Sequence, residues 1–428
     1  MKNFLLIFLG KLILKLSRLF NLGSGSTWPG HIAISINPNF TTDVLRKSKS
    51  KIIIIAGTNG KTTTSLLIQT ILEGAGYKTL HNKSGANLEN GIASTLLEGI
   101  SLGGRLPFDF LLFESDENTL PNLLEQINPD YLVLLNLFRD QLDRYGELDS
   151  IAKKWKKGIY GLLEKSTLIL NADDPQISFF SEDTRAKTYF FGIKSPLSGS
   201  SIAHGADSIF CPKCSSKLTF SQVFYSHLGI WSCTGCGLKR KTPQLSASSH
   251  YPLEGLHNKY NVNAASLLAK VLRIPQSSLN KSLTRFEPAF GRQEKLIVDN
   301  KSVQIYLSKN PTSLNETLSI LNTHKATDVL IILNDRVPDG LDVSWIWDVN
   351  FENHLSKNTV ISVSGDRLWD MSLRLKYAGF KKIISFPNLD DAIKNSLENT
   401  RPGNTLFILP NYSAMLETRK ILTGKKIL

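Results

Sequence analysis

The sequence predicts an α/β protein with a central domain built on a doubly wound, mostly parallel sheet and a second, smaller α/β domain. Three observations support this class. Short apolar runs rich in Ile, Val and Leu alternate with helical segments, and most of these runs end in acidic or polar residues. One such run leads into a glycine loop that is followed by Lys and Thr. The length of 428 residues exceeds that of one ordinary domain.

Composition limits the classes of partner without choosing among them. Hydrophobic residues make up 41% of the chain, which is enough to build packed cores and argues against global disorder. The 50 basic residues outnumber the 37 acidic ones and give a net charge of +13. Such a charge favours acidic partners, which include nucleotides, phosphorylated substrates, nucleic acids and anionic membranes.

Residues 1–45 are expected to form an N-terminal helix and a lead-in to the first domain. The apolar segment at residues 1–16 is interrupted by Lys11 and Lys15 and lacks a small-residue cleavage site, so it does not match a signal peptide. It is also too short and too charged to span a bilayer. An amphipathic helix remains, which either packs on its own domain or lies on a membrane surface. Residues 27–30 are expected to form a turn.

The stretch at residues 52–64 organises the central domain, which is expected at residues 46–290. Its β-branched run predicts a buried parallel strand, and residues 65–72 after the loop predict a helix. Glycines let backbone N–H groups approach a polyphosphate, and a helix N-terminus favours negative charge. The loop therefore predicts an ATP and Mg²⁺ site, in which Lys61 reaches the β- and γ-phosphates and Thr62 binds Mg²⁺. The residues of this site are Gly57, Thr58, Asn59, Gly60, Lys61, Thr62 and Thr63.

The loop is a variant of the common phosphate-binding pattern. That pattern would place a glycine where this chain has Ile55, so the match is to the shorter Gly-Thr-x-Gly-Lys-Thr form. A chance turn rich in Gly and Thr is the alternative, but the strand before the loop and the helix after it are what the mechanism requires. A nucleotide enzyme of this kind indicates a cytoplasmic location.

Further apolar runs predict more strands of the same sheet, at residues 77–81, 108–113, 131–137 and 167–170. The carboxyl ends of parallel strands meet at one edge of a sheet, so the polar residues after these runs are expected to lie near the loop. Glu114 follows the second run, and beside a phosphate loop it is a candidate Mg²⁺ ligand. An exposed acidic turn is the alternative for this segment.

The four cysteines of the chain form two Cys-x-x-Cys pairs in an insertion expected at residues 205–242. They are Cys211, Cys214, Cys233 and Cys236. Their spacing predicts a zinc ribbon, and four thiolate ligands from the protein predict a structural Zn²⁺ rather than a catalytic one. Four unligated thiols are the alternative. Few basic residues lie between the two pairs, so we expect the ribbon to stiffen a loop or contact a partner, and we expect no nucleic acid as a partner.

Residues 255–261 open a predicted helix at residues 262–271. Asn258 and Asn261 stand at i and i+3, which places two amides on one face near the helix N-terminus. A histidine such as His257, taken by itself, is more often a structural residue with its hydrogen bonds satisfied.

Residues 291–428 predict the second α/β domain, with strands expected at residues 303–307, 328–333, 359–363 and 405–409. Polar residues again collect at the carboxyl ends of the strands, so this domain is expected to form the second wall of a site. The loop at residues 339–348 contains three Asp and two Trp. A solvated acidic turn is the alternative for that loop.

Several stretches, taken together and in this order, resemble the Mur ligase family. The family comprises ATP-dependent amide-forming enzymes of peptidoglycan synthesis and folylpolyglutamate synthase. The matching stretches are residues 57–63, Glu114, residues 171–175, Gly255-x-His257-Asn258-x-x-Asn261 and Gly291-Arg292-x-Glu294. The resemblance implies a Mur ligase-like central domain with the inserted four-cysteine zinc ribbon and a smaller α/β C-terminal domain.

Within that family the chain is similar, nearly end to end, to the ligase subunit of lipid II isoglutaminyl synthase. The distinguishing stretches are residues 136–147, the four-cysteine ribbon, residues 309–311 and residues 342–348. The resemblance implies that ATP phosphorylates the α-carboxylate of D-glutamate in the lipid II stem peptide. Ammonia from a separate glutaminase subunit of the GatD type, held in a heterodimer, then converts the acyl phosphate to D-isoglutamine.

The same resemblance implies roles for individual residues. Lys61 and Thr62 contact phosphates and Mg²⁺, and Glu114 binds a second Mg²⁺. A C-terminal Asp is expected to be catalytic, with Asp342 as the first choice and Asp348 as the second. The remaining implied positions are His257 and Asn258 near the metal and nucleotide, Arg292 on a phosphate, and Asn171 and Asp174 near the base or ribose.

The chain departs from the wider family at two points. Gln141 stands where many members have a His, and no counterpart of their carbamylated lysine can be placed. How the second Mg²⁺ is held is therefore open.

Two other functions compete with this interpretation. The first is another ligase, either an amino-acid-adding Mur enzyme or a folylpolyglutamate synthase, which would need no glutaminase partner. The second is a nucleotide-regulated binding module whose ribbon grips nucleic acid, which predicts salt-sensitive binding and little ATP turnover.

Overall fold

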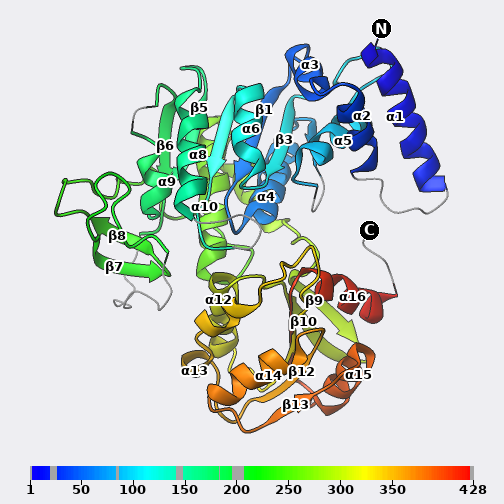
Figure 1. Ribbon diagram of the computed structural model, residues 1–428, viewed down its shortest axis with the longest axis vertical. Helices are drawn as coiled ribbons and strands as arrows, with labels where there is room; N and C mark the ends of the chain where they lie inside the picture. Colours follow the sequence, from blue (N-terminus) through cyan, green and yellow to red (C-terminus); the bar gives the residue numbers. More distant parts are fainter. Residues whose placement is uncertain are drawn as a thin grey trace.

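The computed structural model describes residues 2–19, 27–82, 86–140, 148–182, 184–194 and 207–424. Figure 1 shows two α/β bodies one above the other, with a small two-stranded hairpin beside the upper body and helix α1 at its opposite edge. The α/β class with a mostly parallel central sheet, a C-terminal domain and a cysteine cluster confirms the predicted architecture.

The upper sheet has six strands that all run parallel, in the order β2-β3-β1-β4-β5-β6. The strands are β1 (Lys51–Ala56), β2 (Thr79–His81), β3 (Phe110–Ser115), β4 (Tyr131–Leu134), β5 (Thr167–Asn171) and β6 (Lys187–Phe191). Strand β1 lies at the centre, and its side chains alternate between the two cores: Ile52 and Ile54 face one, Ile53 and Ile55 the other. Burial on both faces explains why the run is continuously apolar.

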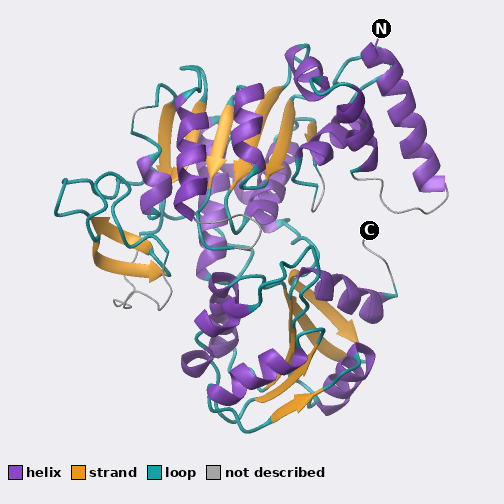
Figure 2. Cartoon of the chain, viewed as in Figure 1, coloured by secondary structure: helices purple, strands orange, loops and turns teal. Residues whose placement is uncertain are grey.

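Helices cover both faces of this sheet, as the doubly wound class requires (Figure 2). One face carries α5 (Glu89–Gly99), α6 (Thr119–Gln126), α8 (Leu148–Tyr160) and α9 (Pro175–Phe179), with the N-terminal helices α1 (Lys2–Leu19), α2 (Trp28–Ile36) and α3 (Phe40–Arg46) beside them. The other face carries α4 (Lys61–Gly74), α10 (Leu256–Val271) and α11 (Gln276–Thr284).

The lower sheet also has six strands, in the order β13-β12-β11-β14-β10-β9, and only β9 runs antiparallel to its neighbour. They are β9 (Arg292–Val298), β10 (Lys301–Tyr306), β11 (Asp328–Ile332), β12 (Val360–Ser364), β13 (Ile383–Ser385) and β14 (Thr405–Pro410). One face packs α12 (Pro311–Thr323), the 3₁₀ helix η1 (Ser344–Asp348), α13 (Phe351–His354) and α14 (Leu368–Tyr377), and the other packs α15 (Leu389–Asn399) and α16 (Tyr412–Thr423).

The predicted elements differ from the structure at several points. The turn expected at residues 27–30 is wrong, because α2 begins there and carries Pro29 in its first turn, where a missing N–H costs nothing. Helix α10 begins at Leu256, several residues before the predicted start. Strands β6 and β13 were not expected, since their sequences lack a strong apolar run. Among the described residues, no helix is long and apolar enough to cross a membrane.

Candidate active site

A cavity of about 570 Å³ opens between the carboxyl edge of the upper sheet and the lower domain. Ligand pockets of proteins commonly have this size. The phosphate loop lines it at residues 58–63, together with side chains from α10 and from the lower domain. Of the predicted site residues, the cavity therefore brings together the loop, Glu114, His257, Asn258 and Arg292.

The loop needs glycine at two positions. Gly57 has φ +148° and Gly60 has φ +89°, a backbone region that favours glycine. A Cβ at Gly60 would lie 2.1 Å from Oδ1 of Asn261, and the Nδ2 of Asn261 in turn donates to Asn258 Oδ1 at 3.1 Å. The tight turn thus sets the start of α4 directly against the first turns of α10.

Lys61 is buried at the N-terminus of α4 and is held by three acceptors, one of which is the carbonyl of Thr58 at 3.4 Å. Its Nζ donates to the carbonyl of Gly57 at 2.5 Å and to Glu117 Oε2 at 3.1 Å. Burial by itself would raise the pKa of Glu117, but the ammonium charges of Lys61 and Lys309 outweigh it and lower this pKa. The cluster therefore keeps a buried carboxylate charged beside the loop.

A second ion pair of this kind joins the two domains. The Nζ of Lys309, which precedes α12, donates to Asp140 Oδ2, just beyond β4. Burial would lower the pKa of Lys309, but the carboxylates of Asp140 and Glu117 outweigh burial and raise it. Within the described chain, Glu117 Oε1 and Asp140 Oδ1 are buried without a hydrogen-bond partner. A cation could bind the two unpaired carboxylate oxygens, and a polyphosphate could pair with the two neighbouring lysines.

Glu114 is the last residue but one of β3 and lies next to the loop. Its Oε2 accepts from the hydroxyl of Thr62 at 3.0 Å, its Oε1 accepts from Ser65 at 2.7 Å, and His81 Nε2 lies 3.4 Å from Oε1. Burial opposes the charged form, but the hydrogen bond and charge of His81 lower the pKa of Glu114 overall. Nη2 of Arg292 reaches the same Thr62 hydroxyl at 3.3 Å. Thr62 and Glu114 therefore bring together a hydroxyl and a carboxylate, which are oxygen ligands of the kind that Mg²⁺ prefers.

His257 and Asn258 reach the cavity from the first turn of α10. Nδ1 of His257 lies 3.5 Å from Glu316 Oε2 of α12, so the ring bridges toward the lower domain. Nδ2 of Asn258 donates to the carbonyl of Glu254 at 2.7 Å. The early start of α10 explains this placement, because both side chains leave an ordered helical turn.

Asn171 and Asp174 are not among the residues that line the cavity. Both side chains are fully buried and form hydrogen bonds with backbone groups. Nδ2 of Asn171 donates to the carbonyl of Leu135 at 2.9 Å, and Asp174 Oδ1 caps α9 by accepting from the N–H groups of Gln176 and Ile177. Their predicted contact with the base or ribose has no geometric support here.

The two candidate aspartates of the lower domain differ in what they face. Asp342 lies just before η1 and bonds within its own turn, since its Oδ1 and Oδ2 accept from the N–H and hydroxyl of Ser344 at 2.8 and 3.0 Å. Asp348, at the other end of η1, points to the upper domain and lies 3.2 Å from Nη2 of Arg139. Arg139 also pairs with Asp207. The predicted motif residues beyond Asp140, including Gln141, lie outside the described residues.

Several residues of the site were absent from the predicted set, and only some left a signal in the sequence. Glu117 and Asp140 follow apolar runs, as Glu114 does, and that pattern could have identified them. Lys309 likewise follows β10. Tyr225 lines the cavity from the hairpin, where its ring lies 5.5 Å from that of Phe138, and nothing local in the sequence indicates this.

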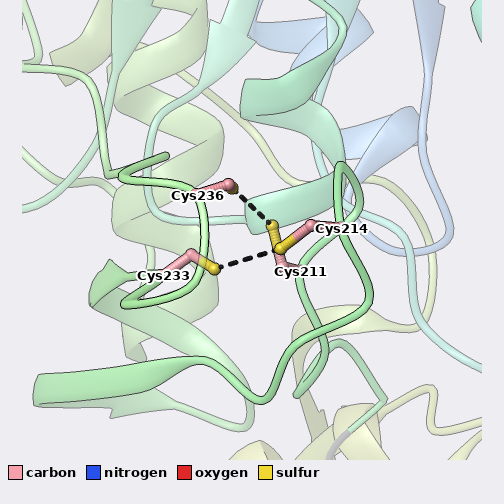
Figure 3. Close-up of side chains that lie close together, drawn as sticks. All are labelled: Cys211, Cys214, Cys233 and Cys236. Carbon is pink, nitrogen blue, oxygen red and sulfur yellow. Dashed lines mark hydrogen bonds between the residues drawn. The ribbon is translucent and has the colours of Figure 1, made fainter.

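The four cysteines form one cluster at the open end of the hairpin, two before β7 and two after β8 (Figure 3). All four sulfurs lie within 4.8 Å of one another, with 3.4 Å between Cys214 and Cys233 and 3.6 Å between Cys211 and Cys236. Thiolates around a tetrahedral Zn²⁺ with Zn–S bonds of about 2.3 Å lie about 3.8 Å apart. The four side chains therefore fit a zinc ion.

The insertion is anchored to the carboxyl end of β5. Its strands are β7 (Thr219–Tyr225) and β8 (Leu228–Ser232), which pair antiparallel. Nε1 of Trp231 donates to the carbonyl of Ala172 at 3.1 Å, and Nε of Arg240 pairs with buried Asp173 at 2.6 Å. Because β7 ends at Tyr225, this anchorage also positions a wall of the cavity.

Two family models match the chain. The Mur ligase middle domain matches residues 55–269, and the MurT ligase C-terminal domain matches residues 307–415. Among curated proteins, the chain is similar to the lipid II isoglutaminyl synthase (glutamine-hydrolyzing) subunit MurT of Streptococcus pneumoniae, with 31% identity over 96% of this chain and 95% of that protein. The subunit of the same name from Staphylococcus aureus is 31% identical over 97% of this chain and 96% of that protein.

Solved structures of more distant proteins share the fold. A pseudomurein peptide ligase type C from Methanothermus fervidus superposes with a TM-score of 0.67 at 22% identity, over 89% of this chain and 80% of that one. MurF from Thermotoga maritima, in complex with ADP, superposes with a TM-score of 0.62 at 14% identity, over 91% and 83%. Because two relatives are 31% identical over nearly the whole of both chains, and because both family models match, the chain belongs to the MurT family of Mur ligases.

Proposed function

We propose that this protein is the ligase subunit of a lipid II isoglutaminyl synthase, which amidates the α-carboxylate of D-glutamate in the lipid II stem peptide. The observation that carries the proposal is the buried cluster around the phosphate loop, in which Lys61, Thr62 and Glu114 meet beside unpaired carboxylate oxygens. The full-length similarity to the MurT subunits supports the choice of acceptor.

The chemistry explains why such a cluster is needed. A carboxylate is a poor electrophile, so one of its oxygens must first become a leaving group. The carboxylate oxygen attacks the γ-phosphorus of ATP, and the bond to ADP breaks. Ammonia then attacks the acyl carbon of the resulting acyl phosphate, loses a proton, and phosphate departs to leave D-isoglutamine. Phosphoryl transfer of this kind depends chiefly on positioning and on neutralising charge.

Individual residues contribute binding and orientation. Lys61 exchanges its internal acceptors for phosphate oxygens, and Arg292 adds a second cation from the lower domain. Thr62 and Glu114 would hold Mg²⁺, which supplies charge neutralisation when bound. His257 and Asn258 orient the nucleotide from α10.

We assign the catalytic aspartate to Asp348 rather than to Asp342. Asp348 faces Arg139 across the domain boundary, whereas both carboxylate oxygens of Asp342 are used within its own turn. A carboxylate near the acyl carbon can orient the ammonia and take up the proton that it loses.

Ammonia must come from a partner. All four cysteines of the chain belong to the metal cluster, so no thiol remains as the nucleophile of a glutaminase. A GatD-type glutamine amidotransferase subunit, bound as a heterodimer, meets this requirement. The cysteine cluster itself holds a structural Zn²⁺.

The protein works in the cytoplasm at the inner face of the membrane, where a lipid-linked acceptor is available.

The test is ATP-dependent amidation of lipid II, with an ammonium salt alone and then with a glutaminase partner and glutamine. A mass loss of about one unit, as OH is replaced by NH₂, together with ADP release is the expected result. A response to glutamine that requires the partner would establish the division between subunits. No amidation from either nitrogen source, by a folded protein that binds ATP, would overturn the proposal and direct the search to amino-acid-adding ligases.

A further inference from the structure

Helix α1 presents two faces of opposite exposure, and the first packs on the protein. Leu6, Gly10 and Ile13 follow one another at i, i+4 and i+7, which places them on one side of the helix. Leu6 is 4% exposed, and a Cβ at Gly10 would lie 2.9 Å from the methyl carbons of Leu97 in α5. This face therefore lies in close contact with the central domain, and the helix is held in a defined orientation.

The second face carries large apolar side chains in solvent. Phe8, Leu12 and Lys15 follow with the same spacing on the other side of the helix, and Leu9 lies beside them. Phe8 is 50% exposed, Leu9 37% and Leu12 44%. Single exposed apolar residues are ordinary, but neighbouring ones on one helix face mark an interaction surface.

Charge indicates what covers this face. Asp43 is the first acidic residue of the chain, whereas Lys2, Lys11, Lys15 and Arg18 all precede it. A helix that combines exposed Phe and Leu with lysine and no acidic residue has the composition of one that lies in an anionic membrane interface. Each basic residue near such a surface adds attraction, and lysine stems extend so that the ammonium stays at the headgroups.

The position of α1 is compatible with such contact. Figure 1 shows α1 at the outer edge of the upper body, beyond α2 and α5, with no element on its far side in this view. Trp28, which opens the adjacent α2, is 72% exposed, and tryptophan is enriched at membrane interfaces. No described helix can cross a membrane, so contact would be made in the plane of the surface.

We propose that α1 docks this protein on an anionic lipid surface, with Phe8, Leu9 and Leu12 inserted among the headgroups and Lys15 at the level of the lipid phosphates. The inference deepens the proposed function, because its benefit to catalysis rests on a lipid-linked acceptor. Docking confines the ligase to the surface that carries the acceptor and so raises the effective concentration of the acceptor.

The test is flotation of the purified full chain with two kinds of vesicle, one of phosphatidylcholine alone and one that also contains phosphatidylglycerol. We expect binding only to the second kind, weakened by salt. The double variant Phe8→Ser/Leu12→Ser should bind at least about tenfold more weakly, since it removes two apolar side chains that would insert among the lipid headgroups. Both side chains are exposed in the protein, so an unchanged melting curve is expected for the variant.

Two further variants make the test specific. Lys15→Glu should weaken vesicle binding by about fivefold or more through charge alone. Ile297→Ser removes an apolar side chain that is 76% exposed on β9, far along the chain from α1, and it should leave vesicle binding unchanged. Equal binding of the parent and the double variant, or equal binding to uncharged vesicles, would overturn the proposal.

A protein partner on the same face gives a different outcome. If a second copy or another subunit covered Phe8 and Leu12, the double variant would alter the assembly measured by light scattering and leave vesicle binding intact, which would also overturn the proposal. Amidation of a water-soluble acceptor separates this inference from the proposed function. The double variant should amidate that acceptor at the parental rate and slow only on lipid II in vesicles. No amidation of either acceptor by the parent, with vesicle binding retained, would refute the proposed function alone.

Discussion

The side chains of Asn59 and Asn310 exchange amide hydrogen bonds between the phosphate loop and the lower domain. Nδ2 of Asn310 donates to Asn59 Oδ1 at 3.1 Å, and Nδ2 of Asn59 donates back at 3.4 Å. Asn310 also caps α12, because its Oδ1 accepts from the N–H of Ser313 at 2.9 Å. One amide thus starts a helix and joins the two walls of the cavity.

These two roles can be separated by substitution. Asn310→Asp keeps the cap oxygen but loses the donor to Asn59, so we expect an almost unchanged melting temperature and a raised KM for ATP. Asn310→Ala loses both, and its free energy of unfolding should fall by about 1 kcal/mol. Thermal melts and ATP kinetics on both variants check this. An unchanged KM in Asn310→Asp would mean that the amide pair does not couple the domains.

Lys61→Ala should abolish amidation while leaving the partner bound. The substitution removes the cation that we propose binds the phosphates, and it leaves the buried Glu117 carboxylate without its ion pair, which destabilises the loop. The double variant Lys61→Ala/Glu117→Gln is the matched control, since it removes the unpaired charge; it should regain stability but not activity. Amidation assays, melting curves and co-purification with the glutaminase subunit distinguish these effects. Loss of partner binding in the double variant would show that the loop supports the interface.

Asp348→Asn should lower kcat by about 100-fold or more, the usual range for a lost acid–base group. Asp342→Asn is its natural control, because Asp342 lies in the same loop and accepts a hydrogen bond from the N–H of Ser344. We expect it to keep near-parental kcat and to change stability by less than about 1 kcal/mol. The reverse ranking of the two variants in single-turnover amidation would assign the role to Asp342.

Cys214→Ser should lower stability before it affects chemistry. Loss of one thiolate weakens Zn²⁺ binding, and metal binding is coupled to folding of such small clusters. Because β7 carries Tyr225 to the cavity, a decline in ATP affinity should follow only as the hairpin loosens. Zinc content by elemental analysis and melting curves with and without a chelator measure this. A stable, folded but inactive variant would contradict a structural role for the metal.

Asp173 should make stability depend on pH in an unusual direction. Burial raises the pKa of Asp173 to about 6, although Arg240 opposes the shift. A carboxyl with a raised folded-state pKa binds more protons folded than unfolded, so the free energy of unfolding falls as pH rises from about 4 to 6. A shift of about two units corresponds to about 3 kcal/mol.

Urea unfolding across this pH range measures that dependence. Asp173→Asn is the comparison, since it cannot titrate and should show a flatter profile between the same limits. Parallel profiles for parent and variant would mean that Asp173 stays ionised against Arg240 throughout.

Local sequence predicted the strands well where both faces of the sheet are buried. Such strands require unbroken apolar runs, and β1, β3, β5, β11 and β14 all lie within a few residues of the expected positions. The sequence also predicted the phosphate loop and the cysteine pairs, because each is defined by the spacing of residues that lie close together in the chain. Strands β6 and β13 were missed since their sequences are mixed or short, and their pairing with a neighbour decides their conformation.

Sequence by itself determined the class of fold, the phosphate loop, Glu114 beside it and the grouping of the four cysteines, all of which follow from local periodicity or spacing. Only the tertiary structure decided which side chains meet across the cavity. Asn59 and Asn310 are 251 positions apart, and Asp140 and Lys309 are 169 apart. These contacts depend on how the two sheets are oriented relative to each other. The same holds for Asp342 and Asp348, which share a loop and of which Asp342 was the first choice from sequence. In the structure Asp342 accepts a hydrogen bond from Ser344, whereas Asp348 pairs with Arg139.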